Sequence, residues 1–451
     1  MESDVVNKHQ GDKFNLRSLV KPLRRYIAKK LYSWDIYVYF LYPNTEKLIT
    51  IIQSRFYSNK LATVVSDIKS LAAERGWLFK ICQPTTIQQC EASRTIVEDT
   101  WDIVKHGRLR VNQSHSSRLY HSRERGEMYY SHLYATVRYP VYETFKCEIP
   151  GATILSPTGV AVTSQLEALA ASTTASPVEL SARVPFLLSS SSSPVQMAGT
   201  YVSLVGVYSQ GNYAHWLMDY LPRLALLEPS DTEFKVIVDA YPERYRIDSL
   251  KLLGISEERV VEMKQKSIYV EKLILCHAAQ RLGVPSAVHL HNIRDRLVSA
   301  VIGSRYSSSP NRRIYISRAK SSRKIVNENE LLPILLEYNF EVVFCEELSL
   351  QEQIRLFSES NVVMGAHGAG VFNHIFCNPG ATVIEIYNRQ RWEHAPRKLA
   401  SLMNHKHWHI FGEQVDNDWN TWLDPRKLQK VLAYALEESP LKEGALHEEV
   451  Y

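Results

Sequence analysis

The segment Asn361–Tyr387, "NVVMGAHGAGVFNHIFCNPGATVIEIY", decides the predicted fold. It begins with an apolar run that leads into a glycine-rich loop, Gly365–Gly370. A short helix, "VFNHIFCNPG", and a second apolar run, "TVIEIY", follow. A strand, a loop, a helix and another strand in this order are typical of a βαβ unit, in which the strands are parallel.

The same alternation continues toward the N-terminus. "RIYISR" (Arg313–Arg318) and "FEVVFC" are predicted strands, each followed by a predicted helix. Earlier in the chain, "GTYVSLVGVYS", "FKVIVDA" and "KLILCH" are predicted strands that alternate with helices such as "NYAHWLMDYLPRLALLE". Strands that alternate with helices form parallel sheets covered on both faces. The pattern therefore predicts an α/β fold of two Rossmann-like lobes with parallel sheets.

The segment between the two series, "GSRYSSSPNRR" (Gly303–Arg313), combines glycine, serine, proline and charge, as linkers do. Two lobes joined by a linker predict a cleft between them. From about residue 75 to Thr200 the pattern indicates only a mixed α/β part of the first lobe. We expect an N-terminal helical extension, a first lobe, a second lobe, and a C-terminal helix and tail, at 1–75, 76–303, 304–423 and 424–451.

Composition limits the class of protein. Apolar residues make up 45% of the 451 residues and charged residues 22%, as in a soluble globular protein. The net charge of +5 suits an anionic small ligand or a membrane surface, but it is too weak to indicate nucleic acid as a partner. The six cysteines form no CxxC pair, so neither a zinc site nor a disulfide framework is indicated. No apolar stretch is long enough to span a bilayer and the first residues do not resemble a signal peptide, so we expect a cytoplasmic protein.

Residues 18–34, "SLVKPLRRYIAKKLYSW", place apolar side chains at helical spacing among lysines and arginines. A basic amphipathic helix of this kind can lie on an anionic membrane, which would make the protein peripheral at the inner face. Alternatively, its apolar stripe packs on the rest of the fold.

The glycine-rich loop is the first candidate site. Glycine lets backbone N–H groups approach a ligand closely and permits positive φ, and the helix expected to begin near Val371 adds unpaired donors, so the loop is predicted to bind an anion. Glu385 ends the next strand and could accept both hydroxyls of a ribose. Arg318 and Arg323 lie near the end of the first strand of this lobe and suit phosphate. The residues expected to hold the donor are Arg318, Arg323, Gly365, His367, Gly368, Ala369, Gly370, Asn373 and Glu385.

Two other uses of a glycine loop fit less well. "HGAG" resembles the oxyanion loop of esterases, but the chain has no G-x-S-x-G elbow. A dinucleotide dehydrogenase would carry its glycines after the first strand of the unit, and here they follow the third.

The second candidate site is the helix "NYAHWLMDYLPRLALLE". Asn212 is a predicted N-cap, and His215, Asp219 and Arg223 follow at i, i+4 and i+8, so they share one predicted face. An imidazole beside a carboxylate can accept a proton, and either His215 or Asp219 could be the base. A solvated helix face with a chance pair is the alternative.

Together these segments resemble glycosyltransferase family 61. The resemblance is carried by "NYAHWLMDYLPRL", "RRIYISR" and "MGAHGAGVFNHIFCNPGATVIEIY", and it covers roughly Gly206 to Tyr387. It implies a GT-B fold, in which two Rossmann-like lobes face each other across a cleft, with the donor on the second lobe. It also implies an inverting transfer from a nucleotide sugar, typically UDP-linked, to a glycan or glycolipid acceptor, as in bacterial members proposed to build surface polysaccharides.

An inverting transfer needs one general base and fixed positive donors for the departing diphosphate. No metal cofactor is expected, because backbone amides and arginines can neutralise the diphosphate. "DND" (Asp416–Asp418) and the alternating histidines of "HKHWH" (His405–His409) are weak metal-site patterns. A non-catalytic nucleotide-sugar-binding protein and a Rossmann oxidoreductase remain as alternatives.

Overall fold

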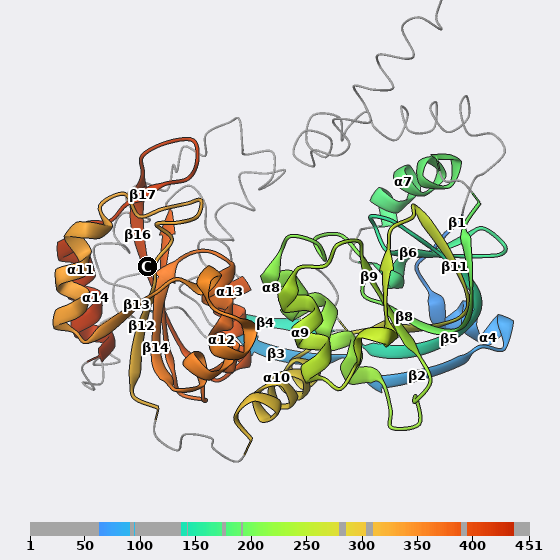
Figure 1. Cartoon of the computed structure of the whole chain (residues 1–451), viewed down its shortest axis with the longest axis horizontal. Helices are drawn as coiled ribbons and strands as arrows, with labels where there is room; N and C mark the ends of the chain where they lie inside the picture. Colours follow the sequence, from blue (N-terminus) through green and yellow to red (C-terminus); the bar gives the residue numbers. More distant parts are fainter. Residues whose placement is uncertain are drawn as a thin grey trace, which may run out of the picture.

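The computed structural model describes residues 63–90, 94, 137–141, 143–173, 177–190, 193–278, 286–303, 310–388 and 395–436. The amphipathic segment 18–34 and the tail beyond residue 436 lie outside the described residues. Within the described ranges, no helix is both long and apolar enough to cross a bilayer. The predicted α/β class is confirmed, because helices pack on two large sheets (Figure 1).

The second sheet has six strands in the order β13-β12-β14-β15-β16-β17. Its strands are β12 (Arg312–Ile316), β13 (Phe340–Val343), β14 (Ser360–Ala366), β15 (Thr382–Asn388), β16 (Lys406–Gln414) and β17 (Thr421–Trp422). All neighbouring strands are parallel except β17, which is antiparallel to β16. Every residue of β15 is buried, as expected for a central strand covered on both faces.

Helices cover both faces of this sheet. They are α11 (Glu328–Glu337), η6 (Cys345–Glu347), α12 (Leu350–Ser358), η7 (Ala369–Phe376), α13 (Ala395–Leu402) and α14 (Pro425–Leu436). Apolar side chains of α11 and α14, such as Leu335 and Val431, pack with Trp408 on the outer face. The helix α12 begins with a capping box, in which Ser349 and Glu352 each bond to the other's backbone N–H.

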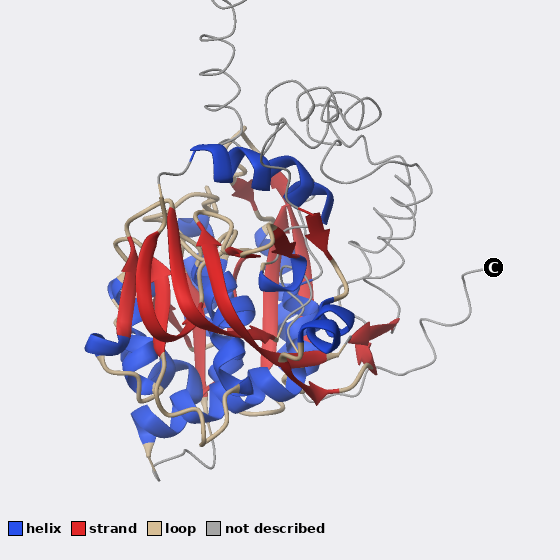
Figure 2. Ribbon diagram, turned by 90° about the vertical axis from the view of Figure 1, so that its right-hand side faces the viewer, coloured by secondary structure: helices blue, strands red, loops and turns tan. Residues whose placement is uncertain are grey.

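The first sheet has nine strands in the order β1-β7-β6-β5-β11-β8-β9-β10, with β2 paired to β5. They are β1 (Thr63–Val65), β2 (Leu78–Gln83), β5 (Thr144–Leu155), β6 (Val160–Thr163), β7 (Glu167–Leu169), β8 (Val195–Ser203), β9 (Lys235–Asp239), β10 (Val260–Met263) and β11 (Ser267–His277). Seen from this side of the molecule, the sheet is curved (Figure 2). The strands β3 (Thr86–Cys90) and β4 (Val137–Val141) form a separate antiparallel pair.

The prediction of a parallel sheet is only partly right for this lobe. The strands β11, β8, β9 and β10 are parallel, whereas β5, β6 and β7 pair antiparallel with one another and β5 pairs antiparallel with β11. The short turns that join β5, β6 and β7 leave no length for a crossover helix, so these strands must reverse direction. Moreover, β1 and α4 (Ile68–Arg75), which we expected in the N-terminal extension, belong here, because β1 pairs with β7.

The predicted long helix after β8 is three short helices. They are α8 (Tyr213–His215), η3 (Trp216–Tyr220), which is a π-helix, and η4 (Leu221–Leu226), which is a 3-10 helix. The Leu221 N–H donates to the Trp216 carbonyl, one residue farther back than in an α-helix. Pro222 has no N–H and stands at the start of η4, where none is needed. The remaining helices of the lobe are η2 (Ala170–Ser172), α7 (Pro177–Ser190), α9 (Arg244–Leu252), η5 (Glu257–Arg259) and α10 (Ala287–Ile302).

Helices of both lobes meet between the two sheets. Figure 1 shows α12 and α13 on the inner side of the second sheet, opposite α8, α9 and α10. Their apolar side chains form one buried cluster, to which Trp216 and Leu290 contribute from the first lobe and Ile354 and Phe372 from the second. The lobes therefore share a continuous hydrophobic core, and the space between the sheets is packed over this region.

Candidate active site

The glycine-rich loop lies at the point where the strand order of the second sheet reverses. After β12 the chain forms β13 on one side and then returns to form β14 on the other. Arg318 follows the end of β12, and Gly365–Gly370 overlaps and follows the end of β14. Ligands of open α/β sheets bind outside the carboxyl ends of the strands at such a point. The topology therefore brings these two predicted donor contacts to one place.

The loop glycines allow close approach. A Cβ added to Gly368 would lie 2.0 Å from Arg318 Nη1, and one added to Gly365 would lie 3.1 Å from Ile316 Cβ. The left-handed backbone that glycine permits is not used, since Gly368 has a φ of 170°, which is extended. The glycines are thus required for space, and Gly368 in particular lets the Arg318 guanidinium lie against the loop backbone.

Only part of the loop backbone is open to a ligand. The His367 N–H donates to the Ile386 carbonyl (2.9 Å), so that donor is already committed. The first hydrogen bond of η7 runs from Val371 N to Gly368 O (3.1 Å). The N–H groups of Ala369 and Gly370 precede this bond and form the amino end of η7. The predicted anion site is therefore smaller than expected, and its helix is a 3-10 helix that starts at Ala369.

A buried carboxylate holds His367 in place. Glu385 Oε1 lies 2.6 Å from His367 Nδ1, and Glu385 Oε2 lies 3.3 Å from His407 Nε2. Burial alone would raise the pKa of Glu385, but the positive charge and hydrogen bond of His367, followed by those of His407, lower it to about 2. Because Glu385 is fully buried and both its oxygens bond to histidines, the direct ribose contact that we expected is replaced by a role in orienting His367.

Asn373 also differs from its prediction. Its side chain is fully buried, so it cannot contact a donor directly. Its Oδ1 accepts a hydrogen bond from the Tyr213 hydroxyl of the first lobe, and its Nδ2 donates to Gln353 Oε1 (2.6 Å). Burial, the largest effect, raises the pKa of Tyr213 well above its usual value, so the hydroxyl keeps its proton. Asn373 thus ties η7 to α8, the helix that carries His215.

The His215–Asp219 pair is formed as predicted from the spacing. His215 Nδ1 lies 2.6 Å from Asp219 Oδ2, and the Asn212 side chain accepts from the His215 N–H (3.3 Å) as an N-cap. Asp219 is fully buried, whereas the His215 side chain is 20% exposed. A carboxylate accepts hydrogen bonds, so His215 Nδ1 carries the hydrogen and Nε2 is the ring atom that a substrate hydroxyl can approach. Of the two residues left open as the base, the geometry favours His215, with Asp219 orienting it.

Arg223 does not share the face of this pair. The change from π-helix to 3-10 helix turns it inward, where its Nη1 donates to the carbonyls of Ser172 (3.4 Å) and Ser203 (3.3 Å). Burial lowers the pKa of Arg223. Its guanidinium lies 4.8 Å from the centre of the Tyr220 ring. Arg223 therefore supports the loop after β8 and is no part of the site surface.

The loop after β12 carries both predicted arginines. Arg318 is partly buried, and its Nε donates to the Ser322 carbonyl (2.9 Å). Arg323 adopts a left-handed backbone conformation with a φ of 60°, which is uncommon for a residue with a long side chain. Residues in such conformations concentrate at ligand sites. The loop itself is thus held in one shape beside Gly368.

The two patterns that we set aside as metal sites make hydrogen bonds within the protein. Asp416 accepts from the N–H groups of Asp418 (2.9 Å) and Asn420 (3.1 Å), so "DND" forms a turn. His407 bonds to Glu385, and burial lowers the pKa of His409 to about 3, so that ring is neutral at pH 7. Among the described residues, no group of His, Cys, Asp and Glu side chains is arranged to hold a metal ion.

Several important contacts were not predicted. Tyr213 and Asn373 are 160 positions apart, so nothing in the sequence could reveal their hydrogen bond. His407 was noted only as one of three alternating histidines. Tyr208, whose ring stacks on His215 with 5.2 Å between centres, had one available signal, its position four residues before the predicted N-cap.

The helices that carry or follow the two half-sites are in contact, because α8 packs against η7 and Tyr213 bonds to Asn373. The family model described as "Glycosyltransferase 61" matches residues 213–384. This part of the chain is therefore similar to glycosyltransferase family 61. The family 61 segment begins two residues before His215 and ends one residue before Glu385, so it contains both the His215–Asp219 pair and the glycine-rich loop.

Individual relatives match a shorter stretch of the chain. The "EGF domain-specific O-linked N-acetylglucosamine transferase" of Gallus gallus is 36% identical over 78 residues, which is 16% of this chain and 15% of the relative. The protein of the same name from Drosophila melanogaster is 32% identical over 77 residues, with the same shares of each chain. That from Bos taurus is 35% identical over 78 residues, again 16% and 15%. The alignments thus span about 15% of the length of these relatives.

Proposed function

We propose that this protein is an inverting glycosyltransferase that moves a sugar from a nucleoside diphosphate donor, UDP in the first instance, to a hydroxyl of a glycan or glycolipid acceptor. The observation that carries the proposal is the contact between α8 and η7. This contact joins the helix that carries His215 to the helix that follows the glycine-rich loop, where Arg318 lies against Gly368. The family 61 match and the N-acetylglucosamine transferases among the relatives support the same activity.

His215 is the proposed general base. As the acceptor oxygen bonds to the anomeric carbon, its proton passes to His215 Nε2 and the imidazole becomes a cation. Asp219, at 2.6 Å from Nδ1, stabilises that cation and keeps the ring in position. The proton then leaves to solvent through the exposed edge of the ring. Because the displacement is a single step, one base suffices and the anomeric configuration inverts.

The leaving diphosphate is the proposed ligand of the glycine loop. The bond between the anomeric carbon and the phosphate oxygen breaks as the new bond forms, so negative charge grows on that oxygen. The N–H groups of Ala369 and Gly370, the Arg318 guanidinium and His367 supply fixed positive donors for it. With these donors in place we propose that transfer needs no metal ion, and that the two lobes act as the donor and acceptor halves of a GT-B-type enzyme.

The test is release of UDP from a panel of UDP-sugars by the purified protein, with and without EDTA. Asp219→Asn should lower the rate by about 10²–10⁴-fold, the usual effect of a general-base system, while UDP binding measured by calorimetry stays unchanged. Asp418→Asn, which alters an exposed aspartate in the "DND" turn, is the matched control and should leave both unchanged.

Other outcomes would redirect the proposal. If UDP binds but no sugar donor is ever consumed, the protein is a nucleotide-sugar-binding protein without turnover. If Asp418→Asn or EDTA abolishes release, a metal-dependent mechanism replaces the metal-free one. If a fluorescence titration shows nicotinamide dinucleotide binding and no UDP binding, the oxidoreductase alternative gains.

A further inference from the structure

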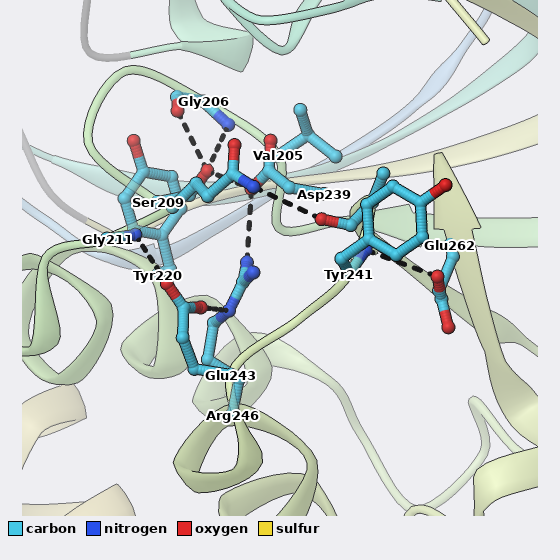
Figure 3. A network of polar contacts seen from close by, with 12 residues as sticks. Val205, Gly206, Ser209, Gly211, Tyr220, Asp239, Tyr241, Glu243, Arg246 and Glu262 are labelled. Atoms are coloured by element: carbon cyan, nitrogen blue, oxygen red, sulfur yellow. Dashed lines mark hydrogen bonds and ion pairs between the residues drawn. The ribbon is translucent and has the colours of Figure 1, made fainter. Parts of the chain in front are cut away.

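Two loops of the first lobe are joined beside His215. One follows β8 (residues 204–212) and the other follows β9 (residues 240–243). The Ser209 hydroxyl bonds to the Asp239 carboxylate, Gln210 Nε2 donates to the Ala240 carbonyl (3.2 Å), and the Gly211 N–H donates to Glu243 Oε1 (2.8 Å). Figure 3 shows this network from close by. The two loops therefore form one surface at the carboxyl ends of neighbouring parallel strands.

Buried charge holds the loops from behind. Arg246 is fully buried, its Nη1 lies 3.2 Å from Asp239 Oδ2, and its Nε lies 2.6 Å from Glu243 Oε2 (Figure 3). The Tyr220 hydroxyl donates to the Val207 carbonyl. A guanidinium that pairs with a carboxylate at the end of β9 and with another at the start of α9 fixes the loop between them. These interactions hold the surface in one shape without a bound ligand.

Each loop presents one tyrosine in a strained conformation. Tyr208 has a φ of 68° and Tyr241 a φ of 53°, values that are rare for bulky side chains. The Tyr241 N–H is held by Glu262 Oε2 (3.2 Å). Strain of this kind persists where the surrounding structure enforces it, and it concentrates at ligand-binding sites. Here the hydrogen bonds and ion pairs that join the two loops enforce it.

Both tyrosines are exposed at the surface. Tyr241 is 78% exposed and Tyr208 is 38% exposed. One face of Tyr208 stacks on His215, and Lys264 Nζ lies 5.7 Å from the centre of the Tyr241 ring. An exposed aromatic face bordered by polar groups suits a pyranose ring, because the face carries negative charge density that attracts the C–H bonds of the sugar, while polar neighbours reach its hydroxyls.

We propose that Tyr208 and Tyr241 form the acceptor subsite and that its ligand is a carbohydrate of at least two sugar units. Tyr208 positions the unit whose hydroxyl meets His215, and Tyr241 stacks on a part of the acceptor farther from the reacting atoms. This inference rests on the proposed function, since the hydroxyl that reacts is the one at His215.

The experiment replaces Tyr241 in two ways and adds a control at another tyrosine. Tyr241→Asn removes the ring and keeps a residue that tolerates the left-handed conformation, whereas Tyr241→Phe keeps the ring. Tyr434→Asn removes a tyrosine of similar exposure, 54%, from α14 on the outer face of the other lobe. Each variant is assayed for UDP release from the donor alone and with methyl glycosides, lactose, cellobiose and chitobiose. Binding of the same sugars without donor is followed by saturation-transfer NMR.

Tyr241→Asn should raise the apparent KM for the best disaccharide by about tenfold, as expected for loss of one stacking partner, with release from the donor alone unchanged. Tyr241→Phe and Tyr434→Asn should both behave like the wild type. If Tyr241→Asn leaves the acceptor KM and the NMR signal unchanged while donor turnover continues, the subsite inference is wrong and the glycosyltransferase proposal stands. If no donor is turned over but the disaccharide NMR signal is lost in Tyr241→Asn alone, the subsite inference stands and the glycosyltransferase proposal is wrong. If no sugar in the panel binds or reacts with the wild type, the subsite inference is wrong.

Discussion

Glu385→Gln tests the buried charge beneath the candidate donor site. The substitution keeps the size of the side chain and removes the negative charge that bonds to His367 and His407. The pKa of Glu385 falls from the usual 4.5 to about 2 in the folded protein. At roughly 1.36 kcal/mol per pKa unit, this difference corresponds to stabilisation on the order of 3 kcal/mol near neutral pH. We therefore expect Glu385→Gln to lower the free energy of unfolding by about that amount.

The pH dependence follows from the direction of the shift. A carboxyl whose pKa is depressed in the folded state contributes its stabilisation above the unfolded value, 4.5, and loses it as the pH falls toward about 2. The difference in stability between the wild type and Glu385→Gln should thus shrink as the pH falls below about 4.5. Urea unfolding followed by tryptophan fluorescence at pH 7, 5, 4 and 3.5 measures it.

A matched control separates this effect from general acid sensitivity. Glu337 is an exposed glutamate on α11, and Glu337→Gln should change stability by less than about 0.5 kcal/mol at every pH. A Glu385→Gln variant as stable as the wild type at pH 7, or a difference that stays the same at pH 3.5, would refute the view that Glu385 is a buried, charged partner of the two histidines.

Two further substitutions test the loop and the contact between the lobes. Gly368→Ala places a Cβ 2.0 Å from Arg318 Nη1, so the guanidinium must move, and UDP affinity measured by calorimetry should fall about tenfold; an unchanged Kd would show that Arg318 does not contact the donor. Tyr213→Phe removes the hydroxyl that bonds to buried Asn373 Oδ1, which should cost about 1–3 kcal/mol of unfolding free energy, whereas Tyr434→Phe, at an exposed position, should cost nothing measurable.

The second sheet was largely predictable from the sequence. Its apolar runs are short, are separated by helices with apolar periodicity, and end in loop residues, so element order and the position of the glycine loop followed directly. Two strands, β16 and the two-residue β17, were missed. β16 contains His407 and His409 at buried positions, and histidine counts as polar in a pattern analysis, so the alternation indicated a weak metal pattern instead of a strand.

The first lobe was less predictable for identifiable reasons. β5 contains the buried Lys146, which pairs with Asp231, and it also contains Pro150 and Gly151, so its pattern departs from that of a regular strand. The π-helix at Trp216–Tyr220 changes the number of residues per turn, which is why the i+8 position of Arg223 leaves the face of His215. The i+4 pair survives because it spans a single turn.

The candidate site also has features that the sequence predicted and features that it could not predict. Residue types and positions at strand ends led to the prediction of Arg318, Gly368 and His367 as donor contacts, and the structure places Arg318 against Gly368. The burial of each side chain was not predictable, since only the packed structure shows that Glu385 and Asn373 lie beneath the surface. Chemical type alone does not distinguish a residue that contacts a ligand from one that supports such a residue.

The hydrophobic cluster shared by the two halves has a consequence for how this chain can change. Trp216 and Phe372 belong to the same interior, so a fragment cut between α10 and β12 would leave wide apolar faces uncovered on both pieces. Each lobe therefore depends on the other to cover its apolar face. A swap of one half with a distant relative would fail at this boundary unless the buried partners were exchanged with it.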